Sequence, residues 1–184
     1  FEKLYQKLAH VIPGEKLRIL QVIQQDQYRG AEVFCSQLSN HLVDKGLEVE
    51  ILSIFKGEAD LPFKGKLSSL ARPKKHRYVD VKGWRKLAEY IQMYKPDVVQ
   101  ANAADTLKYT VFSKLFYRWK VPVLYRNAST TSFYVNNFVA KGINSFLLNK
   151  VDRIVSVSQA SKRDLNQLFP FTNRKSTVIP VGIE

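Results

Sequence analysis

The sequence is poor in cysteine and lacks any long apolar run. Cys35 is the one cysteine among 184 residues, which excludes an internal disulfide and any metal site built from several cysteines. No apolar stretch approaches the ~18 residues of a membrane-spanning helix, and no signal peptide is visible. Cys35 falls on the apolar stripe of an expected helix, so we interpret it as a core thiol, which fits a reducing cytoplasm.

The signatures of several enzyme classes are also missing. The chain contains neither the GxGxxG fingerprint of nicotinamide enzymes nor a Walker phosphate loop. His10, His41 and His76 are its histidines, and none of them clusters with Cys, Asp or Glu at the spacing of metal ligands. We therefore expect no metal site, and we can propose no Ser-His-Asp set.

Acidic residues are few compared with basic ones. The chain carries 29 Lys and Arg against 16 Asp and Glu, a net charge of +13. Such an excess favours phosphate-bearing ligands, an anionic membrane surface or nucleic acid as partners, or it serves solubility alone. The densest basic cluster spans residues 72–77 and is our candidate for a peripheral contact with anionic membrane. No nucleic-acid-binding motif is present, so we expect no nucleic-acid partner.

The clearest pattern in the chain lies in residues 17–54. A near-continuous apolar run over 17–23 is typical of a strand buried on both faces. A polar loop leads through Gly30 into a helix that ends at Lys45-Gly46, and a second strand covers 48–54. The apolar positions of the helix are Ala31, Phe34, Cys35, Leu38, Leu42 and Val43. This βαβ unit aims the N–H groups of a helix N-terminus at its loop, where an anion is stabilised.

Strands and helices alternate along the rest of the chain. Apolar residues make up 45% of it, enough for one domain with a full core. We expect further strands at 97–101, 121–126, 152–157 and 176–179, and a third strand near Leu67 or within 77–81. Helices are expected at 83–94, 105–119, 133–150 with a bend near Gly142, and 158–169. The alternation predicts an α/β fold with a doubly wound parallel sheet, preceded by a leader segment over 1–16.

Ligands bind such sheets at the carboxyl ends of the strands, so the loops at 24–30, 102–105, 127–131 and 158–161 hold the site candidates. Arg29, Gly30 and Ala31 are candidates for phosphate binding, although a glycine there can also serve only the turn. Asn102 and Asp105 can bind sugar hydroxyls or can simply cap a helix.

Two further loops carry candidate sugar or acceptor ligands. Asn127 and Ser129 form a polar cluster after the strand at 121–126. Ser158 is expected to cap the helix that follows it, and either Ser158 or Lys162 is a candidate for ligand contact. No side chain can be assigned as catalytic acid, base or nucleophile.

Six segments taken in order resemble one family. Residues 17–184 resemble the N-terminal half of a GT-B glycosyltransferase of the large retaining group, glycosyltransferase family 4. The segments are RILQVI, YRGAEVFCSQLSNHLVDKGLEVEIL, KPDVVQANAADTLKY, VPVLYRNAST, VDRIVSVSQASKRDLNQLF and STVIPVGIE. The resemblance implies a Rossmann-like domain on the acceptor side of the enzyme.

The resemblance also carries residues onto the candidate site. In the family a Gly-Gly-Ala/Val-Glu loop approaches the phosphates of the nucleotide sugar, and residues 29–32 (RGAE) match it with Arg29 in place of the first glycine. Residues 100–102 (QAN) replace a His-Ala-His-like segment. The histidine that commonly follows the fifth strand is absent from residues 126–128 (RNA), so its role cannot be carried over.

The family ends its first domain with Val-Ile-Pro-Asn-Gly-Ile/Val-Asp, which residues 178–184 match. The resemblance thus divides the chain into a leader (1–16), a Rossmann-like acceptor-side domain (17–179) and the start of a linker (180–184) to a missing second domain. The chain starts at Phe1, and we expect a fragment that is inactive in isolation.

The function that the resemblance implies is transfer of a hexose-type sugar from a nucleotide sugar to a glycan, lipid-linked or small acceptor. The nucleotide sugar is a substrate, and neither a metal nor a cofactor is implied. The expected location is the cytoplasm, with peripheral contact at the inner face of the membrane. The alternatives are an epimerase-like GT-B protein, a non-catalytic sugar-nucleotide-binding module, and a basic nucleic-acid-binding domain.

Overall fold

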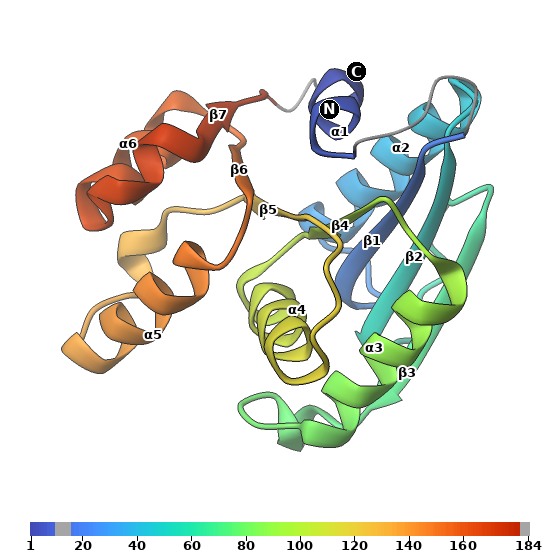
Figure 1. Cartoon of the computed structure of the whole chain (residues 1–184), viewed down its shortest axis with the longest axis horizontal. Helices are drawn as coiled ribbons and strands as arrows, with labels where there is room; N and C mark the ends of the chain where they lie inside the picture. Colours follow the sequence, from blue (N-terminus) through green and yellow to red (C-terminus); the bar gives the residue numbers. More distant parts are fainter. Residues whose placement is uncertain (10–15, 181–184) are drawn as a thin grey trace.

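The computed structural model describes residues 1–9 and 16–180 (Figure 1). Within these residues seven parallel strands form one sheet in the order β3-β2-β1-β4-β5-β6-β7. Helices cover both faces of the sheet. The doubly wound, Rossmann-like α/β fold that the sequence predicts is therefore confirmed.

The elements follow the expected alternation closely. The strands are β1 (Arg18–Gln25), β2 (Glu48–Phe55), β3 (Lys66–Arg72), β4 (Val98–Ala101), β5 (Val123–Asn127), β6 (Arg153–Ser156) and β7 (Ser176–Val178). The α-helices are α1 (Glu2–Leu8), α2 (Gly30–Asp44), α3 (Val81–Tyr94), α4 (Ala104–Tyr117), α5 (Phe138–Asn149) and α6 (Gln159–Leu168). Short 3-10 turns lie at η1 (Lys74–His76), η2 (Thr131–Phe133) and η3 (Pro170–Lys175).

The order of the strands reverses between β1 and β4. Strand β1 pairs with β2 on one side and with β4 on the other, so that Gln21 lies opposite both Ile51 and Gln100. The chain leaves β1 toward one edge of the sheet and later returns from β4 toward the other. In open parallel sheets this switch creates a crevice at the carboxyl ends of the strands, where ligands bind.

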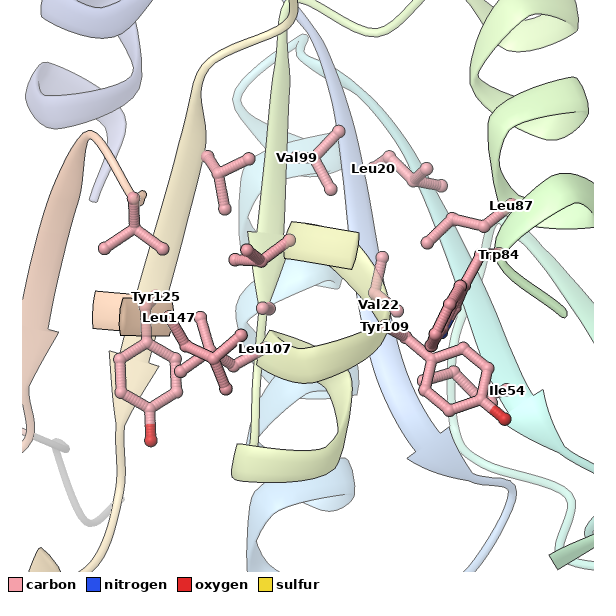
Figure 2. Packing of buried hydrophobic residues seen from close by; sticks show 14 of the residues in the cluster. Leu20, Val22, Ile54, Trp84, Leu87, Val99, Leu107, Tyr109, Tyr125 and Leu147 are labelled. Atoms are coloured by element: carbon pink, nitrogen blue, oxygen red, sulfur yellow. The ribbon is translucent and has the colours of Figure 1, made fainter. Parts of the chain in front are cut away.

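The two larger of three apolar clusters among the described residues hold the helices against the two faces. The larger joins the strands to α3, α4, α5 and α6, and Figure 2 shows side chains of the strands meeting Trp84, Tyr109 and Leu147 in it. All five positions expected on the inner face of α3 are buried: Trp84, Leu87, Ala88, Ile91 and Tyr94. The smaller cluster joins α1 and α2 to the other face through Tyr5 and Leu42.

The structure corrects the start of one helix and locates the third strand, while the other bounds shift by at most two residues. The helix expected over 133–150 begins instead at Phe138, because the side chain of Asn137 accepts a hydrogen bond from the backbone N–H of Ala140 at 2.8 Å and caps it there. It then runs through Gly142 as one helix. The third strand is Lys66–Arg72, the first of the two places expected.

The segment expected as a leader packs into the domain. Tyr5 of α1 is fully buried, and its hydroxyl donates to Gln100 Oε1 on β4 at 2.6 Å. The physical reason is the apolar side of α1, where Leu4 and Leu8 pack against the same cluster. The linker expected over 180–184 lies, except for Pro180, outside the described residues.

Candidate functional site

The N-terminus of α2 is open at the carboxyl edge of the sheet. Arg29 is its N-cap residue and makes no side-chain cap hydrogen bond. Gly30 is exposed, and a Cβ added to it would meet no atom within 4 Å. The N–H groups of a first helical turn have no intrahelical acceptor, and the helix dipole favours negative charge there. Arg29, Gly30 and half-buried Ala31 thus form an accessible place for an anion.

The backbone at Gly30 does not itself need glycine. Gly46 is the glycine with a positive φ in the described part of the chain, so Gly30 adopts a conformation open to other residues. A substitution at Gly30 can therefore test whether this glycine serves ligand binding or only the turn. The sequence alone left these two roles open.

A carboxylate that the sequence reasoning missed lies in the same loop. Ser53 Oγ donates to Asp26 Oδ2 at 3.2 Å, while Asp26 Oδ1 is buried with no partner among the described residues. Burial raises the pKa of Asp26, and the bond from Ser53 opposes that rise only in part. The one acidic residue in the amide-rich run QQDQ, directly after a buried strand, was the available signal.

Asn102 is committed to a buried polar network. Its Nδ2 donates to Gln21 Oε1 at 2.9 Å, and its Oδ1 accepts from Gln100 Nε2 at 2.8 Å. Gln100 in turn accepts from the Tyr5 hydroxyl, which also accepts from Gln21 Nε2. Asn102 is only 1% exposed, so the structure places this candidate in the scaffold, below the surface of the site.

Asp105 is also paired within the domain. Its carboxylate accepts from Gln24 Nε2 at 2.7 Å and from Arg77 Nη2 at 2.9 Å, and Lys108 lies 3.1 Å away. These contacts tie the end of β1 to the start of α4 and to the loop after η1. Asp105 thus fixes the geometry of the edge.

Asn127 joins the ends of β5 and β6. Its Nδ2 donates to the Ser161 carbonyl at 3.2 Å, and its Oδ1 accepts from Thr131 Oγ1 at 3.4 Å. The side chain is fully buried. It therefore resembles Asn102 in being used by the fold.

The other candidates are accessible. Ser158 caps α6, because its Oγ accepts from the backbone N–H of Ser161 at 3.1 Å, as expected. Ser129 and Ser158 are exposed and Lys162 is half-buried. Among the candidate sugar or acceptor ligands, a ligand can reach these three side chains. They come from two neighbouring loops at the ends of β5 and β6.

Arg126 is a second residue whose position the sequence did not reveal. It lies one residue before the end of β5 and is only 3% exposed. Its guanidinium carbon is 4.0 Å from the centroid of the Phe34 ring on α2. Burial lowers the pKa of the guanidinium. The signal was a charged residue at the end of an apolar strand, VPVLYR.

The basic cluster at 72–77 is partly used within the fold. Arg72 donates to Asp80 through Nε at 2.8 Å and Nη2 at 2.9 Å. Arg77 pairs with Asp105, whereas Lys74 and Lys75 are exposed on η1. Two cations of this cluster thus point to solvent without serving the scaffold.

The buried thiol is a core group, in line with its place on the helical stripe. Burial raises the pKa of Cys35 to about 12, against the attraction of Arg126. Within residues 1–9 and 16–180, no three His, Cys, Asp or Glu residues gather as a metal-binding group. No helix of the same ranges has the length and apolar character to cross a membrane.

The sequence profile of the family described as Glycosyltransferase Family 4 matches residues 28–184. No curated protein matches the chain. Solved structures match it over most of its length. Alr3699/HepE of Anabaena, in complex with UDP and glucose, has a TM-score of 0.68 at 16% identity, covering 91% of this chain and 45% of that one.

Two other structures are similar to the chain. The lipopolysaccharide outer core galactosyltransferase WaaB has a TM-score of 0.70 at 11% identity, covering 91% of this chain and 46% of that one. A UDP-N-acetylglucosamine 2-epimerase has a TM-score of 0.63 at 13% identity, covering 89% and 48%. The chain spans less than half the length of these proteins, and at such identities the likeness shows the fold alone.

Proposed function

The chain belongs to glycosyltransferase family 4, and from that premise we propose that it is the first of two domains of a transferase that uses a nucleotide sugar as donor. The observation that carries the proposal is the open, glycine-led N-terminus of α2 at the strand switch. The division expected from the sequence, with the domain ending near residue 179 before a linker, is part of the same proposal.

In this proposal the N–H groups of Gly30 and Ala31 donate to the donor diphosphate. Negative charge grows on the diphosphate as the bond to the sugar breaks, and fixed N–H dipoles stabilise that charge without reorganising. Arg29, which is exposed, adds a positive charge. Following the family resemblance, the donor is a substrate that needs no metal or further cofactor, and transfer retains configuration.

The acceptor binds, in the proposal, at the carboxyl ends of β5 and β6. Ser129, Ser158 and Lys162 are accessible polar side chains there, and a hydroxyl-rich glycan, lipid-linked or small acceptor suits them. The transferred group is a hexose-type sugar. Since no acid or base can be assigned, the rate enhancement comes from positioning and from stabilisation of the leaving group.

The test is turnover by the full-length protein that contains this chain. A panel of nucleotide sugars with glycan and lipid-linked acceptors should release nucleoside diphosphate and yield a glycosylated product. The chain of residues 1–184 alone should show no sustained transfer, because the remaining donor contacts lie in the second domain. Sustained transfer by the short chain would overturn the two-domain division, and a full-length protein inert toward every donor would overturn the function.

An epimerase-like activity is the second candidate, favoured by the structural likeness to a UDP-N-acetylglucosamine 2-epimerase. The same panel of nucleotide sugars and acceptors distinguishes an epimerase from a transferase. An epimerase changes the configuration of the sugar while it remains on the nucleotide, and its product appears without any acceptor. A transferase requires the acceptor for its product.

We also propose a peripheral contact with the anionic inner face of a membrane. Lys74 and Lys75 are exposed beside Tyr78 and Val79, which are 71% and 67% exposed. Each cation near such a surface contributes about 1 kcal/mol, screened by salt. Cosedimentation of the full-length protein with phosphatidylserine vesicles should fall in Lys74→Glu/Lys75→Glu. Equal binding to neutral vesicles would contradict the contact.

A further inference from the structure

Arg126 is a buried cation with no counter-charge bonded to it. Its Nε and Nη1 atoms are buried and have no hydrogen-bond partner among the described residues. Arginine stays protonated inside proteins, so the charge cannot be discharged by loss of a proton. Burying a guanidinium without hydrogen-bond partners destabilises the fold. Its presence is therefore better explained by binding of a ligand than by stability.

The groups around Arg126 do not supply that partner. The guanidinium lies over the ring face of Phe34, but this cation–π attraction is weaker than the attraction of a carboxylate would be. Cys35 and Tyr5 are neutral, since burial raises the pKa of each well above neutrality. Glu32 is the nearby acid that attracts the guanidinium, but its Oε1 accepts from Gln27 and no bond joins it to Arg126.

The unpartnered guanidinium lies in the same corner as the open helix end. Arg126 stands opposite Val155 in the sheet, at the carboxyl end of β5. Phe34, which it contacts, is one helical turn after Gly30 and therefore on the same side of α2. A buried cation and the free N–H groups of a helix start thus converge on one corner of the carboxyl edge.

We propose that Arg126 binds a phosphate oxyanion of a ligand, in concert with the N-terminus of α2. The planar guanidinium can donate two parallel N–H bonds to two oxygens of one phosphate, either from Nε with Nη2 or from Nη1 with Nη2. One phosphate would thus satisfy one of the two unpartnered atoms. The phosphate belongs either to the donor diphosphate or to an anionic acceptor. Only this identity of the ligand rests on the proposed function.

The experiment measures binding of inorganic diphosphate to the full-length protein by calorimetry. Arg126→Met should weaken binding about tenfold to hundredfold, as expected for lost bonds to a charged group. The diphosphate affinity of Arg126→Lys should lie between those of wild type and Arg126→Met, because lysine keeps the positive charge but cannot donate two parallel N–H bonds. Arg163→Met removes an exposed cation from α6 and should bind as wild type does. Without ligand, Arg126→Met should melt higher than wild type.

An unchanged diphosphate affinity in Arg126→Met overturns the proposal, whatever its melting temperature. If that variant does not fold, Arg126→Lys decides: wild-type affinity overturns the proposal and a severalfold loss supports it. Wild-type protein that binds no diphosphate also overturns it.

Competition with UDP identifies the source of the phosphate. Displacement of diphosphate by UDP assigns Arg126 to the donor, whereas simultaneous binding assigns it to the acceptor. Diphosphate binding through Arg126 in a protein inert toward every nucleotide sugar would refute the proposed function and leave this site intact.

Discussion

Arg72 and Arg126 are both largely removed from water, but of the two only Arg72 is hydrogen-bonded to a carboxylate. Arg72 forms two bonds to Asp80, which also accepts from the Gly83 N–H and the Tyr109 hydroxyl, each at 2.9 Å. At the carboxyl edge, Arg126 and one oxygen of Asp26 are buried without partners. In the corner of β3, α3 and α4 the buried charges of Arg72 and Asp80 are paired with each other. In the corner beside α2 the buried polar atoms of Arg126 and Asp26 have no such partner among the described residues.

This difference separates structural polar groups from ligand-binding ones. Buried polar atoms in folded proteins are nearly always hydrogen-bonded, so each exception needs an explanation. By that criterion Asp80, Asn102, Asp105 and Asn127 serve the fold. We propose that the open N–H groups at Gly30 and the guanidinium of Arg126 bind a ligand.

The largest expected effect comes from breaking the completed pair. Arg72→Met leaves the Asp80 carboxylate, 3% exposed, without its main counter-charge, and should lower the free energy of unfolding by about 3–5 kcal/mol. Arg85→Met, which removes an exposed pair with Glu89, should lower it by only about 0.5 kcal/mol. Urea unfolding measures both. Equal losses would show that the buried pair has no special role.

A smaller loss is expected at the buried amide network. Asn102→Ala leaves Gln100 Nε2 without its acceptor and leaves Gln21 Oε1 with only the weak Cys35 S–H donor, at 3.8 Å. The loss should lower the free energy of unfolding by about 1–3 kcal/mol. Donor affinity of the full-length protein should stay close to that of wild type. A stable variant with strongly weakened donor binding would instead make Asn102 a ligand residue.

The smallest expected effect is on the pH dependence of stability, to which Asp26 and Asp80 should contribute with opposite sign. Burial raises the pKa of Asp26, so its contribution to stability is full below the unfolded pKa and is lost as pH rises through the folded one. Burial also acts on Asp80, but bonds from Arg72, Gly83 and Tyr109 outweigh it and lower the pKa. The contribution of Asp80 is present above its unfolded pKa of about 3.9 and is lost as pH falls through the folded value.

Urea unfolding between pH 3 and pH 7 tests this contrast. Relative to wild type, Asp26→Asn should gain stability as pH rises, and Asp80→Asn should lose it. The same direction of change in both variants would contradict the difference between the corners.

The sequence predicts most of the fold because the relevant signals are local. The inner face of α3 follows from apolar residues at helical spacing, and β1 from its continuous apolar run. The start of α5 was wrong by five residues, because the run of apolar residues from Phe133 obscured the cap at Asn137. The packing of α1 was not foreseen, since its partner Gln100 lies 95 residues away.

The sequence predicts the opening at the start of α2, but it predicts the contacts of the candidate side chains only in part. The strand, the glycine and the helix that form the opening at Gly30 are consecutive in sequence. Whether Asn102 or Asp105 is free depends on Gln21 and Gln24, each 81 residues away. Arg126 escaped notice for the same reason, because its lack of a partner is a property of the packed corner.

In the proposed donor site, Gly30 lets a phosphate approach the start of α2. Gly30 and Gly142 both lie in helices, and a Cβ added at either would meet no atom within 4 Å. Valine and glycine have similar helix propensities, so Gly30→Val and Gly142→Val should both melt near wild type. The decisive measurement is the affinity of these two full-length variants for the donor nucleotide sugar. We expect donor affinity to fall about tenfold or more in Gly30→Val and to stay unchanged in Gly142→Val. Wild-type affinity in a normally melting Gly30→Val would contradict it.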